Sequence, residues 1–332
     1  MVNARPQLIV ITPIRNEAWV LEAFLTHCSS WADHIIVANQ HSTDGSREIA
    51  LRFPKVTLID NPDEEMHQAN ARKLLFKAVD CIAGEKIVFA LDADEFLTEG
   101  FEKTDGWRRI MESQPDTIFN FRWQYLENDY AHEQEGVDSY AEWACHFSAD
   151  ACLSDLYSQT ENRAVHEARV PCTASATYIN IPDIRFIHLA RLSQQRTQNK
   201  YDFYQVSTIA KLPHCPSAIS IYRTYHQTPC VTLLPSSVRL TAIGNDSPLN
   251  HLVHTSDHGQ HYIDEMVAII NREGTKKFEK LCIWDNPDLR AAGITYRPSP
   301  HIRLLHKYLK VTQRHSSSLP IRIIDKLLKK II

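Results

Sequence analysis

The chain has 332 residues, of which 43% are hydrophobic and 23% charged, which is enough for one large or two modest domains with a buried core. A formal net charge of −4 excludes a generally basic, nucleic-acid-binding protein. The eight cysteines form no CxxC pair and have neither zinc-ribbon nor disulfide-framework spacing, which favours a reducing, cytoplasmic compartment. The N-terminus has no signal-peptide pattern, and no run of about 18 apolar residues predicts a membrane span.

The first 100 residues alternate between short apolar runs and stretches with helical spacing. Strands are predicted at 8–12, 35–38, 56–59 and 87–91, and helices at about 17–30, 46–53 and 64–79. Alternation of strands and helices at this spacing is typical of right-handed βαβ units. The sequence therefore predicts an α/β fold in which helices flank a mostly parallel sheet.

The pattern changes after residue 100. Residues 117–125 alternate in polarity, which predicts a strand on an antiparallel edge, whereas residues 126–182 are polar and irregular and predict no long helix. Two later elements are predicted, a strand at 184–189 and a helix at 193–212. We therefore expect one domain at 1–212 and a smaller, mixed or helical C-terminal region at 213–332.

Two polar motifs stand at the ends of predicted strands. They are HIIVANQHSTDGS at 34–46 and KIVFALDADEF at 86–96. In both, branched apolar residues give way to small polar and acidic ones, as they do where a parallel strand opens into a ligand crevice at its carboxyl end. In the second motif Asp92 and Asp94 form a DxD pattern of hard oxygen ligands. Such ligands suit Mg²⁺ or Mn²⁺ bound together with a substrate diphosphate.

The C-terminal segment is basic. Residues 301–332 contain eight Lys or Arg residues and one acid, a net charge of +7, so the first 300 residues carry −11. From Leu319 to Ile332, one helical stripe is apolar and the other face is mainly basic; the stripe consists of Ile324, Leu327, Leu328 and Ile331. Such a helix suits peripheral contact with an anionic membrane surface. It equally suits packing on the chain's own core or on a second subunit.

Four ordered motifs resemble the nucleotide-binding half of glycosyltransferase family 2, which has the GT-A fold. They are ITPIRNE at 11–17, VANQHSTDGS at 37–46, HQANARKLL at 67–75 and LDADEF at 91–96. Three later strings resemble the bacterial branch that includes lipopolysaccharide-core β-glucosyltransferases. These are VHE at 165–167, FIHL at 186–189 and KYDFY at 200–204.

The resemblance implies a nucleotide-sugar pocket at the end of the first strand. Thr12 and Pro13 would line it, Arg15 would help to fix the turn, and Glu17 would accept hydrogen bonds from ribose hydroxyls. Arg72 would contact the diphosphate or the donor sugar, although an ion pair with a surface acid explains it equally well. Lys200 would counter phosphates on the donor or the acceptor, and a solvated helix face is the alternative.

Asn39 departs from the family pattern, because an aspartate that reads the base is usual at this position. Asn offers both an acceptor and donors, so it can serve uracil but also cytosine or guanine. A UDP-sugar is favoured by the family, and Asn39 leaves the base open. The neighbouring Gln40 and His41 replace the family's common Asp and Gly, which makes this loop bulkier.

The resemblance also implies a metal site and a catalytic base. Asp94 would bind Mn²⁺ or Mg²⁺ directly, Asp92 would face the ribose, the donor sugar or the metal, and His188 would complete the site. Glu167 would take the proton from the acceptor hydroxyl, with His166 orienting it or the acceptor. A packed structural role is the alternative for His188, and a chance His–Glu pair is the alternative for His166 and Glu167.

We interpret the chain as a cytoplasmic, metal-dependent and inverting glycosyltransferase. It would move a sugar from a nucleoside-diphosphate sugar to a saccharide or lipid-linked saccharide in cell-surface glycan assembly, at the inner face of the membrane if the terminal helix docks there. One alternative is a non-catalytic nucleotide-sugar-binding scaffold, supported only by Asn39 and Gln40. The other is a sugar-phosphate nucleotidyltransferase, which normally needs a Gly-rich loop where this chain has Pro13 to Asn16.

Overall fold

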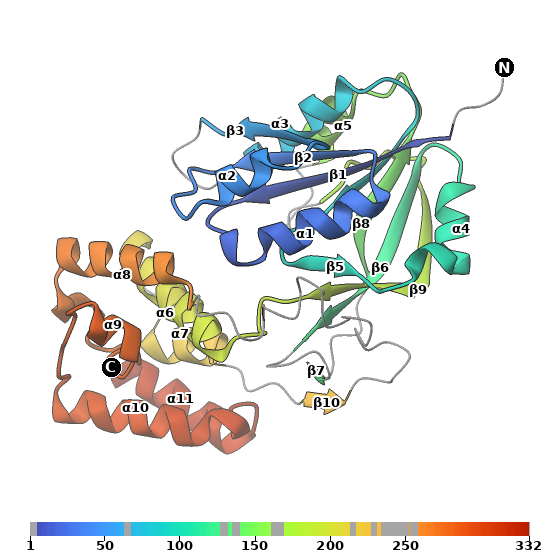
Figure 1. Cartoon of the computed structure of the whole chain (residues 1–332). Helices are drawn as coiled ribbons and strands as arrows, with labels where there is room; N and C mark the ends of the chain where they lie inside the picture. Colours follow the sequence, from blue (N-terminus) through green and yellow to red (C-terminus); the bar gives the residue numbers. More distant parts are fainter. Residues whose placement is uncertain are drawn as a thin grey trace. The chain divides into compact units, whose positions relative to one another are not determined.

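The structure is a computed structural model of the whole chain. It describes residues 5–62, 68–126, 132–134, 140–160, 169–212, 217–226, 231–233, 252 and 258–331. The chain divides into two compact units (Figure 1). Unit 1 comprises residues 1–192 and 231–255, and unit 2 comprises residues 193–230 and 256–332.

Unit 1 is built on an eight-stranded sheet of order β3-β2-β1-β4-β8-β6-β9-β5. Its strands are β1 (Gln7–Ile14), β2 (His34–Asn39), β3 (Val56–Asp60), β4 (Lys86–Ala90), β5 (Glu95–Leu97), β6 (Thr117–Tyr125), β8 (Tyr140–Phe147) and β9 (Thr177–His188). The first four pair in parallel, β6 also pairs in parallel with β9, and the other pairings are antiparallel. A two-stranded ribbon joins β7 (His132–Gln134) to β10 (Val231–Leu233).

The strands predicted in the first 100 residues are confirmed, with ends that differ by one or two residues. The predicted edge position of residues 117–125 is wrong, because β6 pairs with β8 on one side and β9 on the other. Its alternating polarity comes from partly exposed residues near the end of the strand rather than from an open edge. Residues 126–182 also contain a short helix, α5 (Leu153–Thr160).

Helices cover both faces of this sheet. They are α1 (Ala18–Trp31), α2 (Ser46–Leu51), α3 (Gln68–Asp80), α4 (Asp105–Met111) and α5. Successive strand residues point to opposite faces, so Val10 and Val37 join a core with α1, whereas Ile9 and Ile36 join a core with α3 and α5. This two-sided burial explains the continuous apolar runs of β1, β2 and β4. The predicted α/β class is thus confirmed.

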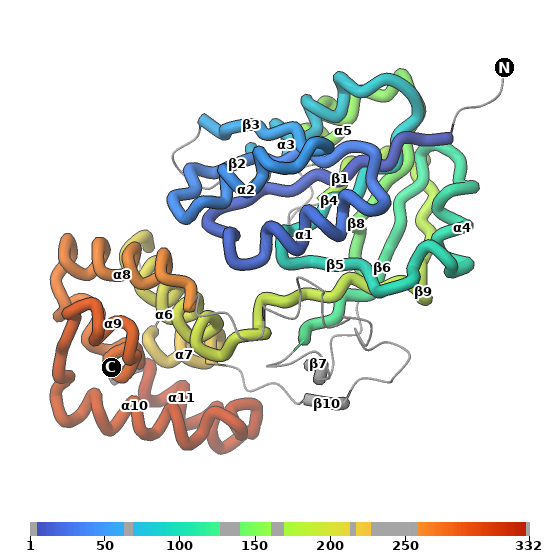
Figure 2. Tube along the Cα trace, in the orientation of Figure 1, coloured from blue at the N-terminus to red at the C-terminus, as the bar shows by residue number. Residues whose placement is uncertain are grey.

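Unit 2 is helical among its described residues (Figure 2). Its helices are α6 (Gln194–Lys211), α7 (Ala218–Tyr225), α8 (Gln260–Glu273), α9 (Pro287–Ala291), α10 (Pro300–Thr312) and α11 (Leu319–Ile331). The predicted helix at 193–212 corresponds to α6. The division by compactness groups α6 with the C-terminal helices, whereas the predicted domain boundary lies after residue 212. Of the helices that the structure describes, none is long and apolar enough to cross a membrane.

His27 is a partly buried histidine on α1 of unit 1, and its Nε2 atom is enclosed. Its ring packs against Phe96 and Phe101, and its Nε2 has no hydrogen-bond partner among the described residues. Burial lowers the pKa of His27 to about 4, from an ordinary value of 6.5. The imidazole is therefore neutral in the folded state at pH values where the unfolded chain binds a proton.

This burial predicts a pH-dependent stability. Between about pH 6.5 and pH 4 the unfolded chain takes up a proton that folded His27 cannot, so stability falls as the pH falls, by up to roughly 3 kcal/mol from this residue. Urea unfolding of His27→Leu should show a weaker loss of stability over this range than the wild-type chain. An identical pH dependence in both proteins would contradict a neutral, partly buried His27.

Candidate functional site

The carboxyl ends of β1, β2, β3 and β4 meet at one edge of the sheet. Ile14 pairs with Asn39, and Asn39 pairs with Asp60, so the polar residues that end these strands are neighbours in register. On the other side of β1, Ile11 pairs with Ala90, and the chain then enters the segment with Asp92 and Asp94. The two motifs that are separated by about 50 residues in sequence therefore flank the same strand.

Hydrogen bonds tie the loop after β1 to the loop after β2. Asn16 has a positive φ of 58°, and its Oδ1 accepts from the backbone N–H of Thr43 at 2.7 Å. The backbone N–H of Glu17 donates to Ser46 Oγ at 2.8 Å, and that of Ala18 donates to an oxygen of Asp44 at 2.9 Å. These bonds hold Thr12, Pro13 and Glu17 at the end of β1. They also explain the polar Ser-Thr-Asp-Gly segment, in which Asp44 accepts from Ser46 as well.

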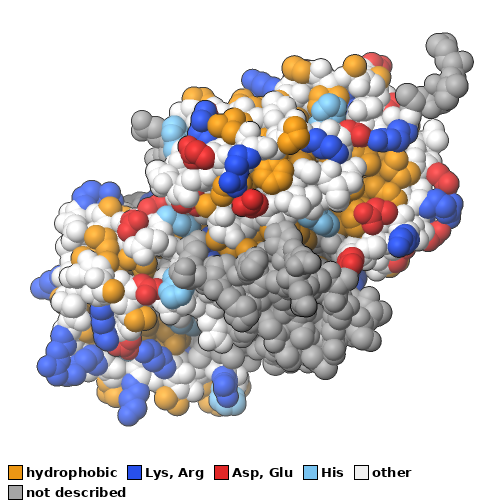
Figure 3. Space-filling model, in the orientation of Figure 1, with side chains coloured by type: hydrophobic (Ala, Val, Ile, Leu, Met, Phe, Trp, Pro, Cys, Tyr) orange, Lys and Arg blue, Asp and Glu red, His pale blue; other side chains and the backbone are white. Residues whose placement is uncertain are grey.

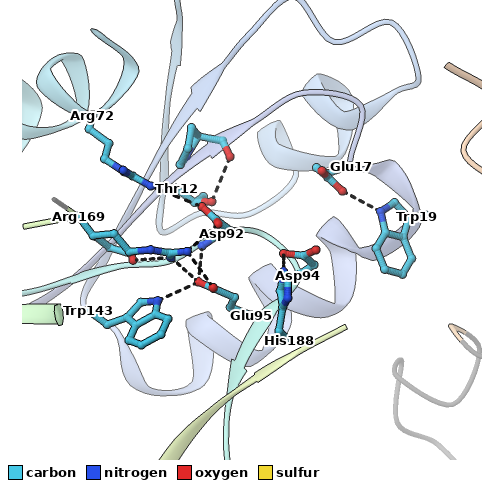
Figure 4. Close-up of polar contacts among 12 residues, drawn as sticks. Thr12, Glu17, Trp19, Arg72, Asp92, Asp94, Glu95, Trp143, Arg169 and His188 are labelled. Atoms are coloured by element: carbon cyan, nitrogen blue, oxygen red, sulfur yellow. Dashed lines mark hydrogen bonds and ion pairs between the residues drawn. The ribbon is translucent and has the colours of Figure 1, made fainter. Parts of the chain in front are cut away.

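Glu17 is the N-cap residue that precedes α1, and its carboxylate accepts a hydrogen bond from the indole N–H of Trp19 at 2.7 Å. Thr12 is buried in β1, whereas Pro13 and Arg15 are half-buried. Figure 4 shows Glu17 and Trp19 together with Asp92 and Asp94, which follow β4. The structure therefore brings the predicted nucleoside-pocket residues to the edge that carries Asp92 and Asp94.

Asn39 uses its side-chain amide to bind two neighbours. Its Nδ2 donates to Asp60 Oδ1 at 2.8 Å, and its Oδ1 accepts from the backbone N–H of Ser42 at 3.2 Å. Asp60 also pairs with the exposed Arg47. Hydrogen bonds from Arg47 and Asn39 hold the pKa of Asp60 below its usual value. An aspartate in place of Asn39 would instead face the carboxylate of Asp60.

Arg169 reaches the acidic residues that follow β4 (Figure 4). Its Nη1 donates to Glu95 Oε2 at 2.6 Å, and its Nη2 donates to Glu95 Oε1 at 3.0 Å and to Asp92 Oδ2 at 2.9 Å. The indole N–H of Trp143 and the backbone N–H of Asp92 also donate to Glu95. Glu95 is fully buried, and it holds Arg169 in a bidentate ion pair.

The charges in this cluster compensate one another. Burial alone would lower the pKa of Arg169, but the charges of Glu95 and Asp92 outweigh it and raise the pKa above its ordinary value. The guanidinium also lies over the Trp143 ring, 5.0 Å from its centroid. For Glu95, burial raises the pKa and Arg169 opposes that shift. The ion pair therefore keeps a fixed positive charge beside Asp92.

Asp94 pairs with His188 rather than with this cluster. His188 Nε2 lies 3.2 Å from Asp94 Oδ1, and the backbone N–H of Leu189 donates to the Asp94 carbonyl at 2.9 Å. The imidazole packs against the rings of Trp123 and Tyr125. His188 Nδ1 is buried with no hydrogen-bond partner among the described residues. Antiparallel pairing of β5 with β9 places Glu95 opposite His188, which sets this contact.

Of the three predicted metal ligands, two are in contact with each other and the third binds an arginine instead. Asp94 and His188 are in contact, whereas Asp92 binds Arg169 and lies 4.0 Å from the buried Arg72. No group of three or more His, Cys, Asp or Glu side chains in the described ranges is arranged to hold a metal ion. A metal at Asp94 and His188 would therefore need further ligands from a bound substrate.

Three of the predicted residues are not placed at this edge by the described structure. Glu167 and His166, the predicted catalytic pair, fall outside the described residues. Lys200 lies on α6 in unit 2, where its ammonium group is 6.0 Å from the centre of the Tyr204 ring. Their predicted roles remain predictions.

Sequence reasoning missed two residues that the geometry brings forward. Arg169 carries no motif signal, because it follows an irregular segment and its acidic partners lie 74 and 77 residues earlier. Asp60 does have a signal, since it ends a predicted strand just as Asn39 does. The rule that polar residues gather at the carboxyl ends of parallel strands would have found it.

The ion pair of Arg169 predicts a strong effect on stability. Arg169→Met leaves the carboxylate of Glu95 buried without its cation, which should cost about 3–5 kcal/mol in the free energy of unfolding. Urea titration monitored by tryptophan fluorescence would measure it. Adding Glu95→Gln to the same chain should recover much of the loss, because no buried charge is then left unpaired.

Arg108→Met is the matched control for this comparison. Arg108 also bridges two carboxylates, those of Asp105 and Glu112, but all three side chains are exposed. Its replacement should change stability little. Equal effects of Arg108→Met and Arg169→Met would show that the Arg169 ion pair is not a buried, compensated charge.

Comparisons with solved structures give only distant likenesses. One is a 4-diphosphocytidyl-2C-methyl-D-erythritol synthase, with 13% identity, coverage of 50% of this chain and 83% of that chain, and a TM-score of 0.33. Another is HddC from Yersinia pseudotuberculosis, with 14% identity, coverage of 57% of this chain and 95% of that chain, and a TM-score of 0.30. A third is the inositol-1-phosphate CTP transferase from T. maritima, with 7% identity, coverage of 56% of this chain and 90% of that chain, and a TM-score of 0.33. At such TM-scores the likeness supports no argument about activity.

The family comparison is more informative. No curated protein matches the sequence. Residues 9–142 match the model of Glycosyl transferase family 2. The matched segment contains β1, β2 and β4 with Thr12, Asn39, Asp92 and Asp94, whereas Arg169 and His188 lie beyond it. Over residues 9–142, which are less than half of the chain, the sequence is therefore similar to glycosyl transferase family 2.

Proposed function

We propose that this protein is a metal-dependent, inverting glycosyltransferase. It moves a sugar from a nucleoside-diphosphate sugar to a hydroxyl of a saccharide or lipid-linked saccharide, which is the reaction that the resemblance of its motifs implies. The observation that carries the proposal is the contact of Asp94 with His188, beside Asp92, at the carboxyl end of β4. The family match over the preceding strands supports the same chemistry.

The residues present fit a divalent cation. Two ligands on adjacent positions of an octahedral ion lie about 3.0 Å apart when each is about 2.1 Å from the ion. The separation of 3.2 Å between His188 Nε2 and Asp94 Oδ1 is close to that value. The carboxylate of Asp94 is a ligand type that suits Mg²⁺ and Mn²⁺, and the imidazole of His188 favours a transition-metal ion such as Mn²⁺ over Mg²⁺. When bound, the cation would stabilise the charge that develops on the leaving nucleoside diphosphate.

The neighbouring residues contact different parts of the nucleotide-sugar donor. Thr12, Pro13, Arg15 and Glu17 line the nucleoside side. The buried amide of Asn39 positions the exposed carboxylate of Asp60, which offers acceptors to the base. Arg72 and Asp92 face the sugar-diphosphate side. Because Arg169 fixes one oxygen of Asp92, the other oxygen remains directed at Arg72 and the substrate side, 4.0 Å from Arg72 Nη2.

The acceptor side rests on the sequence. Glu167 would remove the proton of the acceptor hydroxyl and His166 would orient it, and Lys200 would counter a phosphate. Glu167 precedes Arg169 by two positions, and the ion pairs of Arg169 hold the chain at that later position. Aromatic side chains beside His188, among them Trp123 and Tyr125, supply surfaces on which a sugar ring stacks.

Donor binding can be tested by thermal unfolding with UDP, GDP, CDP and dTDP, each with and without Mn²⁺. We expect one nucleotide, with UDP favoured, to raise the unfolding temperature only when Mn²⁺ is present. A ligand at 100 times its dissociation constant stabilises the folded state by about 2.7 kcal/mol. Asp94→Asn and His188→Gln should each abolish the metal-dependent part of the shift.

Asp155→Asn is the control, because Asp155 is an exposed acid on α5. It should leave the shift unchanged. A shift that needs no metal, or one that survives both Asp94→Asn and His188→Gln, would contradict the proposed metal site. The absence of a shift with any nucleoside diphosphate or intact sugar nucleotide would contradict the proposed donor site.

Catalysis is tested separately from binding. Glu167→Gln should retain the metal-dependent shift with the donor but slow transfer to a saccharide acceptor by about 10²–10⁴-fold, the usual contribution of a general base. Release of nucleoside diphosphate from the sugar nucleotide measures the rate. Unchanged turnover would exclude Glu167 as the base.

A further inference from the structure

Exposed hydrophobic side chains gather on two helices of unit 2. Ten large hydrophobic residues are exposed in the described parts of the chain, and six of them lie on α10 and α11: Leu304, Val311, Leu319, Ile323, Ile324 and Leu327. Leu319 and Leu327 are 69% and 56% exposed. A patch of exposed hydrophobic side chains on one part of a protein marks a surface that binds another protein, a membrane or a ligand.

Helix α11 is attached to the rest of unit 2 by its acid. Asp325 is buried, and its carboxylate accepts from Arg223 Nε at 2.9 Å, from Arg223 Nη2 at 3.1 Å and from the hydroxyl of Tyr308 at 2.8 Å. Arg223 also donates to the carbonyl of Leu309 on α10. Leu328 packs against the same small core. The side of α11 that faces the protein is therefore narrow and partly polar.

The apolar side of α11 consequently faces outward. Leu319, Ile323 and Leu327 recur every four residues and share one face of the helix. The sequence left open whether the apolar stripe packs on the chain's own core. In the structure Leu328 is half-buried and packs on the chain's own core, whereas Ile324 and Leu327 are exposed.

Basic side chains border this apolar face. Arg322, Lys326 and Lys329 are exposed on α11, and none pairs with an acid among the described residues. Arg303 and Lys307 are exposed beside Leu304 on α10. Figure 3 shows Lys and Arg side chains interspersed with hydrophobic ones over the region that Figure 1 labels α10. Asp325, the only acid in residues 301–332, is occupied by Arg223.

We propose that the exposed faces of α10 and α11 form a surface that binds an anionic lipid bilayer. The apolar side chains would enter the boundary between headgroups and acyl chains, and the basic side chains would contact anionic headgroups. A second copy of the chain is a poorer occupant of this surface. Self-pairing through it would bring two segments of net charge +7 together without a carboxylate to offset them.

The inference is tested with the full chain and two kinds of vesicle. One is pure phosphatidylcholine, and the other is an equimolar mixture of phosphatidylcholine and phosphatidylglycerol. Flotation should recover the protein with the anionic vesicles only, and added salt should weaken the binding. The double variant Lys326→Gln and Lys329→Gln should bind about 25-fold more weakly, because each basic residue near such a surface contributes about fivefold.

The apolar contribution has its own variant and control. Ile323→Ser with Leu327→Ser should weaken binding to the anionic vesicles by more than about tenfold. Leu51→Ser replaces a side chain of similar exposure, 59%, on α2 of unit 1, and should have no effect. All variants change exposed residues, so thermal unfolding should match the wild-type chain and exclude misfolding as the cause.

Two outcomes would overturn the inference. The first is failure of the wild-type chain to bind anionic vesicles in preference to neutral ones. The second is a concentration-dependent dimer in analytical ultracentrifugation that Ile323→Ser with Leu327→Ser abolishes, because this face would then bind a second copy. Neither outcome depends on the transferase proposal, which concerns residues on other helices and strands.

Discussion

A guanidinium in the interior of unit 1 is the constraint on which the candidate site depends. Arg169 is stable there because Glu95 binds it through two hydrogen bonds and Asp92 supplies a third contact. Removing either charge would leave the other uncompensated in a region of low polarity. This pairing fixes Asp92 and the start of β5. Since β5 pairs with β9, it also fixes the position of His188 relative to Asp94.

The two carboxylates of the DxD motif thereby acquire different surroundings. Asp92 shares a buried cation and faces Arg72, whereas Asp94 contacts an imidazole that is enclosed by aromatic rings. We infer that this difference separates a substrate-facing acid from a metal-binding one. The same reasoning applies to Asn39, whose amide bridges Asp60 and the loop after β2, where a second carboxylate would meet like charge.

Local sequence patterns predicted the strands and the polar residues at their carboxyl ends, because these features depend on short stretches of sequence. The apolar runs of β1, β2 and β4 identify strands buried on both faces, and the polar residues after them identify the edge that carries the candidate site. Long-range pairing was not predictable in this way. The interior position of β6 depends on β9, about 60 residues later, and Arg169 meets Glu95 across 74 residues. The outward apolar face of α11 follows from the Arg223–Asp325 ion pair, which joins residues 102 apart.

The central claim is that Asp94 and His188 jointly bind a divalent cation with the donor diphosphate. Pulsed electron paramagnetic resonance of Mn²⁺ bound to the protein with UDP tests it most directly, because a coordinated imidazole couples its nitrogen nucleus to the unpaired electrons of the ion. The account predicts a nitrogen coupling in the wild-type chain that disappears in His188→Gln. Bound Mn²⁺ without nitrogen coupling, or a coupling that persists in His188→Gln, would contradict it.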